Sequence, residues 1–196
     1  MKNAYIADTH VGHGNIIKYC RRPFASVVEM DRTIVRNLRE AERKGLCIFH
    51  LGDVAMDLRR AIRLSGEWFT HPDRHIIIVG NHDRYPNQED AYRRTFGQIV
   101  GTKKTWQDNH LIVEDVAHGR TYRLLLSHNP QRDLQGCDLN LHGHHHNNLL
   151  LKPEQFPEEE WGWLLHSNKH INVSAELLNY RPWTLKELLD ARGVNA

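Results

Sequence analysis

The sequence has few of the features that mark disulfide-bonded, membrane-spanning or strongly charged proteins. It holds three cysteines in 196 residues and no Cys-x-x-Cys pair, which argues against a disulfide scaffold or an all-thiolate metal site and favours a reduced, cytoplasmic setting. No apolar run is long enough to span a membrane, and the first residues lack a signal-peptide layout. We therefore expect no membrane partner. The net charge of +2 is too small by itself to indicate nucleic-acid binding.

The composition is that of a folded domain with an unusual histidine content. Hydrophobic residues make up 40% of the chain and charged residues 26%, which is typical of soluble globular proteins. At this length we expect residues 1–196 to form a single domain. The fifteen histidines raise the expectation of metal or proton chemistry.

Five short apolar runs each end in residues that can bind a metal ion. The ends of the runs carry Asp8 and His10, then Asp53, then Asn81, His82 and Asp83, then His128, and finally His144, His145 and His146. Ligands sit at the carboxyl ends of strands in α/β sheets, so we expect these groups to face one point. Oxygen ligands mixed with imidazole suit divalent Mn, Fe, Zn or Ni rather than an all-oxygen calcium site.

Helical and strand patterns alternate in the first half of the chain, and the second half is rich in strands. Helices are predicted over 27–44, 57–69 and 88–96 and from Thr184 onward, and strands over 46–50, 75–79, 103–114, 120–126, 138–141 and 171–174. Ser26 with Glu29, and Thr184 with Glu187, form capping-box patterns. Residues 152–168 are expected to form a surface loop or short helix. This order favours helices covering two packed sheets.

The order of the motifs is more specific than any one of them. Asp-x-His, Gly-Asp, Gly-Asn-His-Asp, His and Gly-His-x-His follow one another over residues 8–146. This order resembles the calcineurin-like metallophosphoesterase superfamily. The segments 8–16 and 19–24 are similar to a small bacterial and phage branch of it. The resemblance implies an α/β fold, a four-layer α-β-β-α sandwich with two packed, mainly mixed β-sheets.

The resemblance also implies a site for two divalent metal ions, with Mn favoured and Fe, Zn or Ni as alternatives. One ion would be held by Asp8, His10, Asp53 and His146, and the other by Asp53, Asn81, His128 and His144. Asp53 would bridge the two ions, because a carboxylate has two oxygens to share. A metal-activated hydroxide would then attack the phosphate ester.

His82 and Asp83 are the catalytic residues that the resemblance implies. His82 would lie near the leaving-group oxygen as a proton donor, and Asp83 would orient it and raise its pKa. The alternative interpretation is that Asp83 caps the next segment and that His82 is exposed to solvent.

Other residues carry weaker indications. His13 is either a substrate or metal-loop contact or a surface histidine. Arg21 and Arg22 could meet a substrate phosphate, because guanidinium groups match phosphate oxygens, or they are simply solvated. Asn172 and Glu176 resemble a segment near the end of the same branch, which implies a structural or metal-supporting role.

Basic pairs recur along the chain. They lie at Arg43-Lys44, Arg59-Arg60, Arg93-Arg94 and Lys103-Lys104. Their scatter and the balancing acids favour solvated helix faces over a nucleic-acid surface.

The implied function is hydrolysis of a phosphate ester by a dinuclear metal site. A phosphodiester is slightly favoured, because the short chain leaves little room for a lid, and a nucleotide or nucleic-acid end would fit such a site. The alternatives are a phosphomonoesterase or pyrophosphohydrolase on the same site, a nuclease acting with a partner protein, and a non-catalytic metal-binding scaffold. A scaffold is expected to lose motif residues, and all seven ligand positions and His82 are intact.

Overall fold

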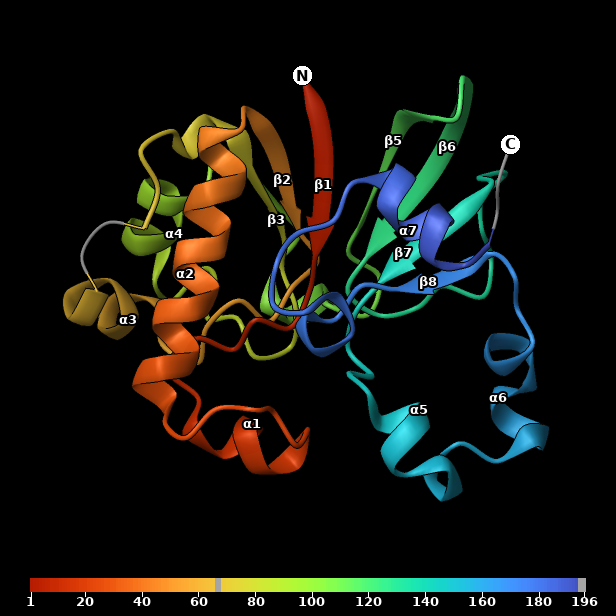
Figure 1. The fold of residues 1–196 in the computed structure, drawn as a ribbon, viewed down its shortest axis with the longest axis horizontal. Coiled ribbons are helices and arrows are strands. Elements are labelled where there is room, and N and C mark those ends of the chain that lie inside the picture. Colours follow the sequence, from red (N-terminus) through yellow and green to blue (C-terminus); the bar gives the residue numbers. More distant parts are fainter. Residues whose placement is uncertain (66–67, 194–196) are drawn as a thin grey trace.

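Two four-stranded sheets form the centre of the computed structural model, which describes residues 1–65 and 68–193 (Figure 1). The first sheet contains β1 (Lys2–Ile6), β2 (Leu46–His50), β3 (His75–Ile78) and β4 (Gln98–Val100), in that order and all parallel. The second contains β5 (His110–Ala117), β6 (Arg120–Ser127), β7 (Leu139–His142) and β8 (His170–Asn172). Only the β5–β6 pair is antiparallel in this mixed sheet. The α/β prediction is confirmed, but the prediction of mixed sheets is wrong for the first sheet.

Seven α-helices are described. They are α1 (Gly14–Tyr19), α2 (Val27–Arg43), α3 (Leu58–Ser65), α4 (Glu89–Thr95), α5 (Asn148–Leu151), α6 (Glu158–Leu165) and α7 (Leu185–Ala191). The predicted caps are present: the Ser26 side chain accepts a hydrogen bond from Glu29 N at 3.2 Å, and Thr184 and Glu187 form a full capping box. Within the segment 152–168, α6 is the short helix that the sequence allowed.

Two predicted elements differ from the structure by more than two residues at one end. The predicted helix 57–69 corresponds to α3, which is described over Leu58–Ser65; residues 66–67 lie outside the described residues, and residues 68–69 are not helical. The predicted strand 103–114 starts only at His110, because Lys103–Thr105 form a 3₁₀ turn with a Thr102–Thr105 capping box. Strand β4 was not predicted.

Helices α2, α3 and α4 cover the outer face of the first sheet. The buried side chains of Met30, Ile34 and Leu38 on α2 belong to the same core as Ile48 and Ile77 of the sheet. The spacing of four residues along α2 places these apolar side chains on one side of the helix. A parallel sheet needs both faces covered, and this helical layer covers one of them.

The other face of the first sheet packs against the second sheet. Tyr5, Phe49 and Ile78 alternate with the outward-facing residues of their strands and share a core with Leu124 and Leu141. Helix α7 contacts β1 and β5, and its leucines join this inter-sheet core. This differs from the predicted fourth layer, because α7 contacts one strand of each sheet and buries its leucines in the core between them.

Backbone hydrogen bonds join the two sheets at the carboxyl ends of their strands. Ala7 N, just after β1, donates to Val173 O at 2.9 Å, and Ala175 N, after β8, donates to Ala7 O at 2.9 Å. These bonds bring the loop after β1 next to loops of the second sheet. Among the described residues, no helix has the length and apolar character needed to cross a membrane.

Candidate metal centre

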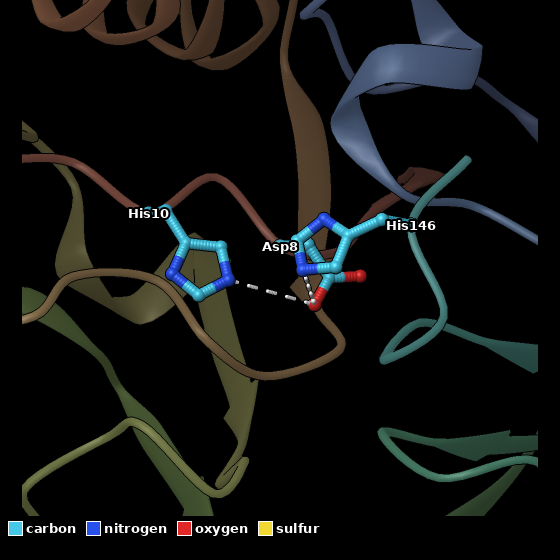
Figure 2. Close-up of side chains that lie close together, drawn as sticks. All are labelled: Asp8, His10 and His146. Carbon is cyan, nitrogen blue, oxygen red and sulfur yellow. Dashed lines mark ion pairs between the residues drawn. The ribbon is translucent and has the colours of Figure 1, made fainter. Parts of the chain in front are cut away.

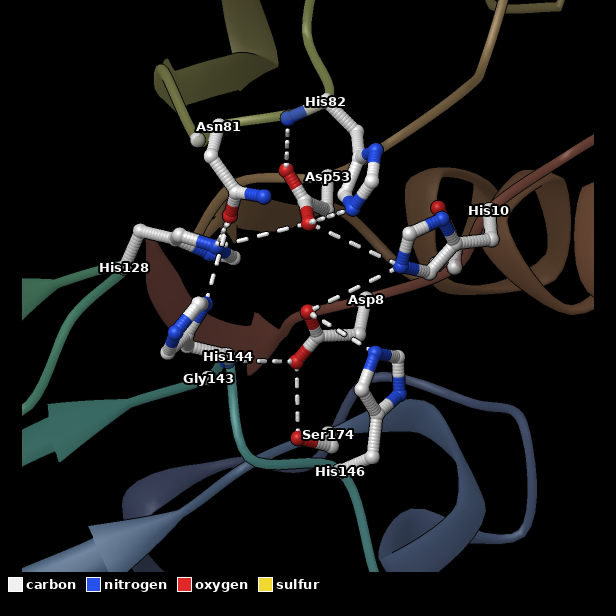
Figure 3. A network of polar contacts seen from close by, with 12 residues as sticks. Asp8, His10, Asp53, Asn81, His82, His128, Gly143, His144, His146 and Ser174 are labelled. Carbon is white, nitrogen blue, oxygen red and sulfur yellow. Dashed lines mark hydrogen bonds and ion pairs between the residues drawn. The ribbon is translucent and has the colours of Figure 1, made fainter. Parts of the chain in front are cut away.

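The loops at this joined edge bring the sequence-predicted site residues together (Figure 3). Asp8 and His10 follow β1, Asp53 follows β2, Asn81 and His82 follow β3, His128 follows β6, and His144 and His146 follow β7. All seven predicted ligands therefore lie in one polar network, which local sequence could only suggest.

Asp8, His10 and His146 form the first group of potential ligands (Figure 2). Asp8 Oδ1 lies 4.0 Å from His10 Nε2 and 3.8 Å from His146 Nε2. Ligand atoms around a divalent ion are roughly 3 to 4 Å apart when each bond is about 2 Å long. The spacing of this group is therefore compatible with a bound divalent metal ion.

Asp53, Asn81, His128 and His144 form the second group. Asp53 Oδ2 lies 3.4 Å from His128 Nε2, and Asn81 Oδ1 lies 2.9 Å from the same nitrogen and 3.2 Å from His144 Nδ1. The Leu51 carbonyl is 2.8 Å from His128 Nδ1 and accepts its proton, so Nε2 is the ring nitrogen that faces Asp53 and Asn81.

Several ligand atoms are buried without a hydrogen-bond partner. They are Asp8 Oδ1 and both ring nitrogens of His10, on residues that are at most 1% exposed. Buried polar atoms in native proteins are normally paired, so each unpaired one calls for an explanation. A divalent cation that takes carboxylate and imidazole ligands fits this donor set.

Five of the seven predicted ligands have a left-handed backbone. The φ angles are 55° at Asp8, 50° at His10, 54° at Asp53, 70° at His144 and 50° at His146. Non-glycine residues rarely adopt this conformation, and it clusters at functional sites where the surrounding structure holds the strain. The sequence does not indicate this feature, because these residue types do not require it.

Glycines make room for the ligand side chains. A Cβ added at Gly80 would collide with Asp53 Oδ1 and would lie 2.7 Å from Asp53 N, and one at Gly143 would lie 2.6 Å from Asp8 Oδ2. The two carboxylates of the site can therefore approach the neighbouring loops only because these positions have no side chain.

Asp83 has a different role from the one predicted. Its buried carboxylate accepts hydrogen bonds from Asp53 N at 2.8 Å, Gly80 N at 2.9 Å and Val54 N at 3.0 Å, and from the Tyr92 hydroxyl at 3.1 Å. The prediction that Asp83 orients the His82 ring is wrong, because these backbone groups occupy the carboxylate. Asp83 instead ties the loop that carries Asp53 to the loop after β3.

His82 lies beside the ligand groups and faces solvent. Its Nε2 is 4.0 Å from Asp53 Oδ2 and its side chain is 43% exposed. The His82 backbone N–H donates to Asp53 Oδ1 at 2.8 Å. The ring is thus anchored through the main chain and is accessible to a ligand from outside.

Arg22 and Glu176 support the first ligand group from behind. The buried Arg22 guanidinium donates to Asp8 O at 2.6 Å, to Thr9 O at 2.9 Å and to Glu176 Oε1 at 2.8 Å. The same Glu176 oxygen lies 3.1 Å from His146 Nδ1. The suggestion that Arg22 meets a substrate phosphate is wrong, and the metal-supporting role suggested for Glu176 agrees with its contacts.

Ser174 is a site residue that sequence analysis missed. Its hydroxyl donates to Asp8 Oδ2 at 2.7 Å, and Asn172 Nδ2 donates to His146 O at 2.8 Å. Cys20, with His146 and Glu176, forms a further group whose ligand atoms lie within 4.8 Å of one another. No local motif distinguishes a serine in this position, so only the packing of β8 against the loop after β1 identifies it.

The weaker candidates lie around the centre. The His13 ring is 5.4 Å from the His10 ring, so His13 borders the first ligand group, whereas Arg21 is exposed. The His145 ring packs between His144, with ring centroids 5.0 Å apart, and Trp161 of α6, with ring centroids 4.8 Å apart. The segment that contains α6 therefore supports the loop between the two histidine ligands.

The buried charges shift one another's protonation. Burial opposes a charge on Asp53, but the adjacent His128 holds the pKa of Asp53 below its ordinary value. Burial lowers the pKa of His128, but Asp53 outweighs it and raises that pKa to about 9. Burial lowers the pKa of His144 to about 3. Metal binding requires unprotonated imidazoles, so cations and protons compete for this site.

Comparison with known proteins shows similarity along almost the whole chain. No protein-family model matches the sequence. The fold is similar to the crystal structure of the protein of unknown function AQ665 from Aquifex aeolicus, with a TM-score of 0.66, 24% identity, and coverage of 97% of this chain and 98% of that one. The uncharacterized protein MJ1445 from Methanocaldococcus jannaschii is 31% identical over 195 residues, covering 94% of this chain and 88% of its own length. The chain therefore belongs to the same protein family as MJ1445.

Proposed function

We propose that the protein is a dinuclear metal-dependent phosphoesterase of the calcineurin-like metallophosphoesterase type, with phosphodiesters as the favoured substrates. The position of Asp53 carries the proposal. Its Oδ2 lies 3.6 Å from His10 Nε2 and 3.4 Å from His128 Nε2, which belong to different ligand groups. A carboxylate between two sets of imidazoles is suited to bridge two cations.

We assign the ligands to two sets that share Asp53. The first comprises Asp8, His10, Asp53 and His146, and the second comprises Asp53, Asn81, His128 and His144; two groups that are close enough to hold an ion, Asp8 with His10 and His146, and Asp8 with Asp53 and His128, support this assignment. Mixed oxygen and imidazole ligands suit Mn, which we favour, and also Fe, Zn or Ni. When bound, two such metal ions would supply Lewis-acid activation of water and would neutralise the charge on phosphoryl oxygens.

His82 is the candidate for proton transfer to the leaving group. Its ring borders Asp53 yet is 43% exposed, so a substrate oxygen can approach Nε2 from solvent. A histidine in this position can hold a proton and donate it to the departing alkoxide. The open approach also accommodates the second ester arm of a phosphodiester, which supports the preference for diesters.

Hydrolysis of two model substrates tests the proposal. Metal-stripped protein with Mn added back should cleave bis-p-nitrophenyl phosphate faster than p-nitrophenyl phosphate, and chelation should abolish both activities. Faster cleavage of the monoester would retain the chemistry and point to a phosphomonoesterase. Two bound metals with no hydrolysis of either substrate would contradict the enzyme proposal and favour a metal-binding scaffold.

A further inference from the structure

A cleft of about 810 Å³ opens beside the candidate metal centre, between α2 and α3. Four of its lining residues come from the loops that carry predicted ligands. Gly12 follows His10 in the loop after β1, Met56 and Asp57 follow Asp53 in the loop after β2, and Arg84 comes two positions after His82. The cleft therefore begins where the first sheet presents its metal-binding groups.

Six arginines line this cleft, which we call the arginine cleft. They are Arg32, Arg36, Arg39 and Arg43 on α2, Arg60 on α3, and Arg84. The α2 arginines are spaced by four, three and four residues, which places them in one row along a single face of the helix. At 1.5 Å per residue this row is about 16 Å long.

The two acids of the arginine cleft, Asp31 and Asp57, accept hydrogen bonds from groups outside the row on α2, and within the row Arg39 donates from Nε to Trp68 O at 2.8 Å. Asp31 Oδ1 accepts a hydrogen bond from Gly12 N at 3.0 Å, and Asp57 Oδ1 accepts one from Arg60 N at 2.9 Å. Asp57 Oδ2 also lies 4.0 Å from Arg84 Nη1. Within residues 1–65 and 68–193, no ion pair involves Arg36 or Arg43, which are both exposed.

We propose that the arginine cleft binds an extended anionic chain of regularly spaced phosphates and leads its reactive end to the metal centre. This inference rests on the proposed phosphoesterase function and specifies its substrate class. Guanidinium forks match phosphate oxygens, and a row of them offers successive contacts along a chain. The basic pairs that look scattered in the sequence thus contribute Arg43 and Arg60 to one surface.

The cleft favours recognition of the backbone rather than of bases. Between the arginines it is lined by Val27, Val35 and Ala61, and no described lining residue is aromatic. Base stacking on aromatic side chains is the usual device for holding single-stranded nucleic acid through its bases. Binding should therefore depend on charge and salt and be indifferent to sequence.

Fluorescence anisotropy tests this inference on the Mn-loaded protein. The probe is a labelled twelve-nucleotide single strand with phosphorothioate linkages, which resist hydrolysis. The variant Arg36→Gln/Arg43→Gln should bind about tenfold more weakly and lower the slope of log Kd against log salt by about 1.4, or 0.7 per lost phosphate contact. The matched control Arg120→Gln/Arg123→Gln removes the same charge from β6 and should leave both values unchanged.

Equal affinity of the cleft variant and the wild type, or an equal loss in the β6 control, would overturn the inference. Competition with inorganic polyphosphate identifies which kind of phosphate chain the arginine cleft binds. Displacement of the probe at equal phosphate concentration assigns the cleft to any phosphate chain, and failure to displace it assigns the cleft to nucleic acid.

Turnover of bis-p-nitrophenyl phosphate separates this inference from the proposed function. This substrate has a single phosphate, which would lie at the metal centre, so its hydrolysis should be unchanged in the cleft variant. If the probe binds in an arginine-dependent way but bis-p-nitrophenyl phosphate is not hydrolysed, the inference about the arginine cleft is retained and the proposed phosphoesterase function is rejected.

Discussion

Glu176 Oε1 lies 3.1 Å from Nδ1 of His146, whose Nε2 lies 3.8 Å from Asp8 Oδ1. A carboxylate on one ring nitrogen fixes the ring and raises the basicity of the other nitrogen, which is how metal-binding histidines are commonly supported. Glu176 is itself held by the buried Arg22, so the first ligand group is braced by residues 154 positions apart in the sequence.

Replacement of Glu176 should weaken the first metal site. Glu176→Gln keeps the volume of the side chain but removes the charge next to His146, and we expect Mn affinity at one site to fall about 10- to 100-fold. Calorimetric titration of the metal-stripped protein with Mn measures this change. Glu158→Gln is the matched control, because Glu158 pairs with His166 at 2.7 Å on the surface. Wild-type affinity in Glu176→Gln would contradict the supporting role.

Asp53 and His82 should respond differently to substitution. Asp53→Asn removes the proposed bridging carboxylate and should reduce metal stoichiometry.

His82→Ala should retain both metals and lower turnover of a diester with a poor leaving group by about 10²- to 10⁴-fold, as loss of a positioned acid does. Metal analysis together with initial rates distinguishes the two effects. Full activity of His82→Ala would reject its role as proton donor.

An added methyl group at Gly80 should disturb the centre without a change in its chemistry. The new Cβ of Gly80→Ala would collide with Asp53, so we expect weaker Mn binding and lower activity. Gly14→Ala is the matched control, because its Cβ would make only an ordinary 3.9 Å contact with Val27. Metal titration of both variants, with far-UV circular dichroism to verify folding, checks the prediction. An unaffected Gly80→Ala protein would show that Asp53 needs no such room.

The free energy of unfolding should fall at mildly acidic pH, because a buried histidine stays neutral in the folded protein but takes up a proton in the unfolded chain. Burial lowers the pKa of His50 to about 3, and its Nε2 lies 3.0 Å from His75 Nδ1. Below the ordinary histidine pKa of about 6.5 the unfolded chain takes up a proton that folded His50 does not. This residue's stabilising contribution is therefore complete above pH 6.5 and declines as pH falls toward 3.

Denaturant unfolding at pH 7.5 and pH 5.5, with chelator present, measures this dependence. Between these two pH values, the free energy of unfolding of His50→Leu should fall by about 1 kcal/mol less than that of the wild type. His166→Leu is the control, because it removes a histidine whose side chain is 72% exposed rather than buried in the core. Identical pH dependence in His50→Leu and the wild type would show that His50 is not the source.

Much of the candidate site can be predicted from the sequence, because strand ends are marked locally. An apolar run followed by Asp8 or by Asn81 identifies both a strand and the groups at its end, and these groups do converge. The role of Asp83 could not be predicted in this way. Its position next to His82 suggests a pair, but the turn after β3 directs its carboxylate toward the backbone of the Asp53 loop.

The sequence by itself determined the α/β character, helix α2 with its cap, and the residue types at the strand ends, because these depend on patterns over a few residues. Only the tertiary structure decided that the first sheet is wholly parallel, that Ser174 hydrogen-bonds the candidate ligand Asp8, and that the arginines of α2 and α3 share one cleft. These relationships join residues that are far apart in the chain. They arise from the packing of two sheets and their helices, which no local pattern specifies.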